Sequence, residues 1–147
     1  MNPTDHYWMK APFIMDTGPM VAWFCPQDKH HVWARRAFSQ LPTGGIICEA
    51  VLAEVCHLVA KDGIAGGKVI EFVERGRLAP VSLAGELPLI RQLLDQYADV
   101  PMDFADGCVV RLAEIHDGAT VCTTDQDFKF YRQHGHELIT LLAPFPA

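Results

Sequence analysis

Short apolar runs alternate with longer amphipathic stretches along this chain. Runs that fit buried strands lie at residues 13–15, 46–48, 78–83, 119–122 and 138–142. Apolar residues recur at helical spacing at about residues 28–40, 49–61, 65–75, 86–97, 101–116 and 125–133. Because strands that alternate with helices form a parallel sheet covered on both faces, the pattern predicts a three-layer α/β/α fold with about five parallel strands.

The composition is that of an ordinary globular domain. Of the 147 residues, half are hydrophobic and one fifth are charged. We expect an N-terminal leader over residues 1–11 and a single domain over residues 12–147. No apolar run approaches the roughly 18 residues that a membrane-spanning helix needs, and the N-terminus lacks a secretory signal pattern. No membrane association is therefore expected.

The cysteines favour a reduced, cytoplasmic protein. There are five, an odd number, and no two of them form a CxxC pair. Four of them lie inside apolar runs and are expected to be small core residues, namely Cys48, Cys56, Cys108 and Cys122.

The net charge of −6 argues against a broad basic surface for nucleic acid. It does not exclude an enzyme that acts on nucleic acid, because bound cations would offset clustered acids. Basic residues do gather locally, at Lys29–Arg36 and at Lys129–His136. Each stretch fits either a guide for an RNA backbone or an ordinary solvated helix face.

Acidic residues follow two of the predicted strands. Asp16 comes directly after Phe13–Met15, and Asp125 follows the strand that ends at Cys122. Ligands of α/β folds bind beyond the carboxyl ends of the strands, which makes both residues candidates for a site. Each also has a plainer interpretation, as a turn residue or a helix cap.

Two further acids lie in predicted helices. Glu54 shares a helical face with Val51 and Leu58, where a carboxylate is costly unless something binds it; the alternative is a partly exposed position at the rim. Asp103 is expected to cap the helix in which Asp106 lies, and Asp106 would also interact favourably with the helix dipole. Gly107, next in sequence, suggests a close approach of backbone or substrate at this point.

In the order and local sequence of these acids, the chain resembles the PIN domain family, and within it the VapC-type ribonuclease toxins of bacterial toxin–antitoxin pairs. The matching segments span most of the chain and read FIMDTGPMVAWF, EAVLAEVCHLVA, PMDFADGCVVRLAE and VCTTDQDF. The resemblance implies a catalytic, metal-binding quartet of Asp16, Glu54, Asp106 and Asp125, with auxiliary residues Thr17, Asp103, Thr124 and Asp127. Gly18 departs from the family, which often has Ser or Thr there, although Thr17 offers a hydroxyl.

The resemblance also implies a function. It implies an endoribonuclease that uses Mg²⁺ or Mn²⁺ to hydrolyse RNA phosphodiesters with a metal-activated water. A cognate antitoxin and a homodimer are the partners that it implies. The alternative is a catalytically silent PIN-like module that binds RNA or a protein. A haloacid dehalogenase-like phosphatase fits less well because it needs an Asp at the position of Gly18.

Overall fold

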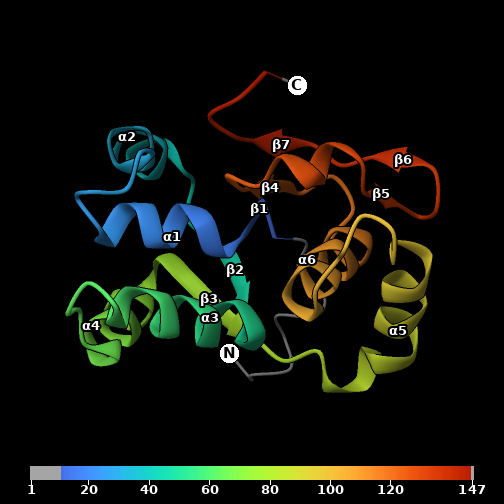
Figure 1. The fold of residues 1–147 in the computed structure, drawn as a ribbon, viewed down its shortest axis with the longest axis horizontal. Helices are drawn as coiled ribbons and strands as arrows, with labels where there is room; N and C mark the ends of the chain where they lie inside the picture. Colours follow the sequence, from blue (N-terminus) through green and yellow to red (C-terminus); the bar gives the residue numbers. More distant parts are fainter. Residues whose placement is uncertain (1–10, 147) are drawn as a thin grey trace.

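A five-stranded parallel sheet forms the centre of the computed structural model, which describes residues 11–146 (Figure 1). The strand order is β3–β2–β1–β4–β7. The strands are β1 (Phe13–Met15), β2 (Gly45–Cys48), β3 (Leu78–Val81), β4 (Thr120–Cys122) and β7 (Leu141–Leu142). The predicted parallel sheet of about five strands is confirmed. Almost all of the expected N-terminal leader lies outside the described residues.

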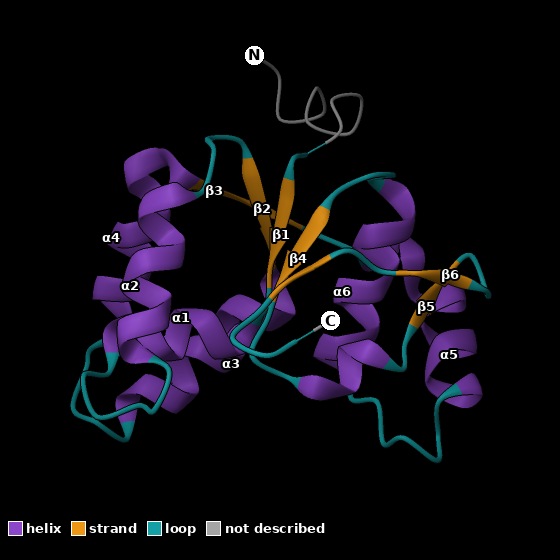
Figure 2. Cartoon of the chain, turned by 90° about the horizontal axis from the view of Figure 1, so that it is seen from above, coloured by secondary structure: helices purple, strands orange, loops and turns teal. Residues whose placement is uncertain are grey.

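Helices cover both faces of this sheet (Figure 2). Those that follow β1 and β2 are α1 (Thr17–Phe24), α2 (His31–Gln40), α3 (Glu49–Ala60) and α4 (Gly66–Phe72). Between β3 and β4 lie α5 (Leu87–Gln96) and α6 (Phe104–Ile115). Figure 2 shows α1, α2 and α4 on one side of the strands and α5 and α6 on the other. The described helices include none with the length and hydropathy of a membrane-spanning segment.

The order of the strands reverses next to β1. The first crossovers place β2 and β3 on one side of β1, and the crossover through α5 and α6 returns the chain to place β4 on the other side. Such a reversal opens a crevice beyond the carboxyl ends of the two central strands. The fold thereby brings together the segments that follow β1 and β4.

The central strands are apolar because they are buried on both faces. Ile14 pairs with Ile46 of β2 and with Val121 of β4, and it is fully buried. Gly45 lets the strands approach, since a Cβ at this position would overlap the Phe13 ring.

The cysteines form part of this interior. Cys48, Cys108 and Cys122 are buried as predicted, Cys25 is buried as well, and Cys56 is half-buried. Burial raises the pKa of the Cys25 thiol to about 11 and that of the Cys122 thiol to about 12.

The C-terminal elements differ from the prediction. In place of a helix over residues 125–133, a 3₁₀ turn at Gln126–Lys129 is followed by the short strand β5 (Arg132–Gln133). The strand predicted over residues 138–142 is divided between β6 (Glu137–Leu138), which pairs antiparallel with β5, and β7. The hairpin turn explains the difference: His134 and Gly135 both have positive φ, 53° and 80°, as tight hairpin turns require.

Two helical details also differ from expectation. The helix expected to end at residue 75 stops as α4 at Phe72 and continues as a wider turn, Val73–Arg77, with Gly76 at φ 89°. Gly107 serves helix packing, because a Cβ there would lie 3.2 Å from Cγ2 of Ile90 and 3.4 Å from Cδ2 of Leu94 on α5.

Replacing Ile14 by Ala should lower the free energy of unfolding by about 3 kcal/mol, because the change leaves a cavity where β1 contacts both of its neighbours. Urea denaturation followed by circular dichroism measures this loss. Val32→Ala is the control, since Val32 is 65% exposed. A loss for Ile14→Ala no larger than that for Val32→Ala would contradict the central position of β1.

Candidate active site

Asp16 is a buried carboxylate at the carboxyl end of β1. It is 4% exposed. The neighbouring strand holds it in place twice: the Asp16 N–H donates to the Cys122 carbonyl at 3.0 Å, and the Thr123 hydroxyl donates to Oδ2 of Asp16 at 2.7 Å. Asp16 and Thr123 lie side by side because Met15 pairs with Cys122 in the sheet. The end of β4 therefore fixes the first predicted site residue.

Asp125 belongs to the same network. Its N–H donates to the Thr123 hydroxyl at 3.0 Å, so that Thr123 connects Asp16 with Asp125. Oδ1 of Asp125 accepts the Asp127 N–H at 2.9 Å and caps the 3₁₀ turn. Asp125 therefore acts as a helix cap, which is its plainer interpretation from the sequence. The same hydrogen bond sets the orientation of the Asp125 carboxylate.

Asp106 stands in the first turn of α6. The predicted N-cap at Asp103 is confirmed as a capping box: the Asp106 N–H donates to Oδ1 of Asp103 at 2.8 Å, and the Asp103 N–H donates to Oδ2 of Asp106 at 3.1 Å. The Tyr131 hydroxyl also donates to Oδ2, at 3.4 Å. Among the described residues, all hydrogen bonds to this carboxylate use one oxygen, and Oδ1 remains available.

Glu54 lies on α3. The sequence predicts it either on the core-facing side of this helix or at the partly exposed rim of that side. Its neighbours Val51 and Val55 are fully buried, whereas Glu54 itself is half-buried. Burial raises the pKa of Glu54, the charge of Asp103 raises it further, and the Thr17 hydroxyl lowers it. The Thr17 hydroxyl is buried, and no described residue lies within hydrogen-bonding distance and angle of it.

The four acids influence one another electrostatically. Burial is the main cause that raises the pKa of Asp16 to about 6, and Asp125 and Glu54 add to it. Burial is likewise the first cause that raises the pKa of Asp106 to about 8, with added repulsion from Asp103, Asp16 and Asp125. Burial also raises the pKa of Asp125. The fold thus places the predicted quartet in one group of mutually repelling carboxylates.

The quartet remains more widely spaced than a closed metal site. In the described part of the chain, no three of its carboxylates have oxygens within 4.8 Å of one another; a separate group, Asp117, His134 and Glu137, does meet that distance.

The neighbouring threonines explain the departure at Gly18. A Cβ on Gly18 would overlap the Thr124 hydroxyl, so the glycine makes room for Thr124 beside the first turn of α1. Thr123 and Tyr131 contact the quartet but are absent from the predicted set. Thr123 could have been found, since it directly follows β4 as Asp16 follows β1. Tyr131 gives no local signal, because its contact with Asp106 joins residues 25 positions apart.

Several of the basic residues considered for RNA contact have packing roles. The Arg35 guanidinium lies 3.9 Å from the centre of the Trp23 ring. The Arg132 guanidinium donates to the carbonyls of Lys129 and Tyr131 within its own turn. The His31 ring lies 2.7 Å from the Ala22 carbonyl. These contacts favour the ordinary interpretation for those three side chains, although each arginine keeps its charge.

Comparison with known proteins identifies the family. The PIN domain model matches residues 13–133, and the chain belongs to the PIN domain family. Among solved structures, it is similar to the VapC20 toxin of Mycobacterium tuberculosis, described as cleaving the sarcin–ricin loop. That match has a TM-score of 0.70 at 18% identity and covers 78% of this chain and 91% of the other, which shows a shared fold. Comparison with curated proteins gives no match.

The raised carboxyl pKa values predict a stability that falls as pH rises. Asp in an unfolded chain titrates near pH ~3.9, so between about pH 4 and pH 8 the metal-free folded state binds more protons than the unfolded state. The stabilisation is complete below the unfolded pKa and is lost as pH rises through about 6 for Asp16 and about 8 for Asp106.

We therefore expect the melting temperature in EDTA to fall from pH 5 to pH 8, and to fall less steeply in Asp106→Asn. Differential scanning calorimetry of both proteins measures the two slopes. Identical slopes would show that Asp106 does not titrate in this range.

Proposed function

We propose that the chain is a divalent-metal-dependent endoribonuclease whose site consists of Asp16, Glu54, Asp106 and Asp125. The observation that carries the proposal is the burial of Asp16 at a strand end, facing other acids that raise its pKa. Burying a carboxylate among carboxylates is unfavourable, and a bound cation reverses the penalty. Membership of the PIN domain family supports the same site.

The residues present fit a hard cation. The four proposed ligands are carboxylates, which suit Mg²⁺ or Mn²⁺ better than metals that prefer nitrogen or sulfur. Oδ1 of Asp106 and Oδ2 of Asp125 accept no hydrogen bond from the described residues. The buried Thr17 hydroxyl also has no hydrogen-bond partner among the described residues. It would be available to hydrogen-bond a water bound to the metal.

A bound cation would supply an activated water and would neutralise the charge that develops on the phosphate oxygens. The chain's own residues hold the ligands in place. Thr123 orients Asp16, the Asp127 N–H orients Asp125, and the Asp103 N–H with the Tyr131 hydroxyl orients Asp106. Glu54, half-buried on α3, would serve as a further ligand or would orient a water at the metal.

The likeness to a toxin supports a proposal for the substrate and partners. VapC20 is described as a toxin that cleaves the sarcin–ricin loop, an RNA element. We infer that this chain is likewise the toxin of a type II toxin–antitoxin pair, that it cleaves RNA in the cytoplasm, and that a cognate antitoxin blocks it. A homodimer is the expected assembly. Recognition of RNA loops, whose bases are unstacked and accessible, agrees with this class of substrate.

Replacing Asp16 by Asn should lower the rate of RNA cleavage by more than about a hundredfold, because loss of a ligand should exceed the effect of losing a residue that merely orients one. Purified protein, a hairpin RNA and Mn²⁺ provide the assay, and EDTA should abolish cleavage. The matched control is Asp95→Asn on the exposed face of α5. If the wild type binds the RNA but cleaves it no faster than Asp16→Asn, the silent-module alternative is correct.

Thr123→Val keeps the shape of the side chain but removes the hydroxyl that joins Asp16 to Asp125. We expect cleavage to fall by about 10- to 100-fold, and the concentration of Mn²⁺ that gives half-maximal activity to rise. Initial rates across a Mn²⁺ titration separate the two effects. Thr140→Val, at an exposed position, serves as control. An unchanged Mn²⁺ dependence would remove Thr123 from the site.

A further inference from the structure

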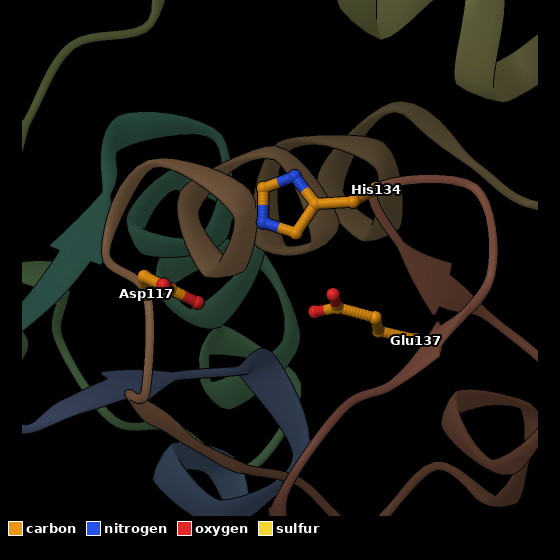
Figure 3. A group of neighbouring side chains, drawn as sticks. All are labelled: Asp117, His134 and Glu137. Atoms are coloured by element: carbon orange, nitrogen blue, oxygen red, sulfur yellow. The ribbon is translucent and has the colours of Figure 1, made fainter.

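A second cluster of potential metal ligands lies outside the proposed active site. Asp117 follows the end of α6, while His134 and Glu137 come from the β5–β6 hairpin. One ligand atom from each lies within 4.8 Å of the other two, and all three side chains are exposed. Figure 3 shows them facing a shared space. Two segments distant in sequence therefore converge on this point.

This cluster is separate from the acidic quartet. Asp106 stands at the start of α6 and Asp117 just beyond its end, which places them roughly 16 Å apart along the helix axis. The cluster also differs from an ordinary patch of surface acids, because it includes an imidazole. No lysine or arginine whose side chain the structure describes forms an ion pair with Asp117 or Glu137. Among the described residues, the salt-bridge contact to either carboxylate is that of the His136 imidazole with Glu137.

The backbone of His134 is fixed where it meets the cluster. Its N–H donates to Oε2 of Glu114 at 2.7 Å, and Oε1 of Glu114 accepts from Arg111 at 3.3 Å. His134 has a φ of 53°, a conformation that histidine adopts uncommonly. Glu114 on α6 therefore holds the hairpin against the helix end, with the imidazole next to Asp117.

We propose that Asp117, His134 and Glu137 bind a divalent transition metal of the zinc class. One imidazole nitrogen with two carboxylate oxygens is a donor set that suits Zn²⁺ and Co²⁺, whereas Mg²⁺ prefers oxygen alone. In a tetrahedral site the ligand atoms stand about 3.4 Å apart. The three ligand atoms all lie within 4.8 Å of one another, and the side chains that carry them are exposed, so closing the cluster to that spacing requires movement of surface side chains.

The metal would join the hairpin to the end of α6. His136 lies outside the group of three, although its Nε2 is 3.9 Å from Oε1 of Glu137. Water fills any position that the protein leaves open. The expected effect is stabilisation of the hairpin that follows Tyr131, whose hydroxyl contacts Asp106.

The test uses the full chain with Asp16, Asp106 and Asp125 replaced by Asn, so that the proposed active site does not contribute to metal binding. Zn²⁺ binding is measured by isothermal titration calorimetry, and Co²⁺ binding by its visible absorption. In this background His134→Asn should weaken Zn²⁺ binding at least tenfold and remove the nitrogen-dependent Co²⁺ spectrum. Asn tolerates positive φ, so the hairpin turn is kept.

His57→Ala, at an exposed histidine on α3, is the matched control and should leave both signals unchanged. Zn²⁺ should also raise the melting temperature of the background protein by a few degrees, and of the His134→Asn protein by much less. Equal Zn²⁺ affinity with and without His134, or an equal loss in His57→Ala, would overturn the proposal. So would the absence of any Zn²⁺ binding in the background protein.

Discussion

The burial of one carboxylate constrains this end of the molecule. Asp16 sits at the carboxyl end of the central strand, with 4% of its surface exposed, and its pKa is raised to about 6 chiefly by that burial. Its hydrogen bond from Thr123 recovers part of the cost. The Thr123 hydroxyl oxygen also accepts a hydrogen bond from the Asp125 N–H. The same side chain therefore fixes both the Asp16 carboxylate and the loop that follows β4. Asp106 and Glu54, the other two acids of the quartet, lie close enough to Asp16 to interact with it electrostatically.

The topology supplies what local sequence does not. The reversal of strand order beside β1 brings the ends of β1 and β4 together, and the crossover through α5 returns α6 to the same edge. Asp106 then uses one oxygen for the capping box and for Tyr131 while the other stays available. A capping role and a place in the acidic group are therefore compatible in one residue. The same combination holds at Asp125, which caps a 3₁₀ turn.

Much of this arrangement could be predicted from the sequence, because its signals are local. The apolar run before Asp16 marks a buried strand, and the cap at Asp103 is a short-range pattern. The hairpin could not be predicted, since a periodic polar and apolar pattern over residues 125–133 also fits a helix and the turn uses a His at positive φ. The contact between Tyr131 and Asp106, and the cluster at Asp117, depend on tertiary packing alone.

A divalent cation shared by the acids after β1 and β4 and at the start of α6 would explain why these carboxylates are gathered at one edge of the sheet. Anomalous diffraction from crystals soaked in Mn²⁺ tests it directly, because the metal is located without reference to activity. We expect a strong peak within coordination distance of the Asp16 carboxylate, with Asp106 and Asp125 as further ligands. A well-ordered site at saturating Mn²⁺ with no peak beside Asp16 would contradict it.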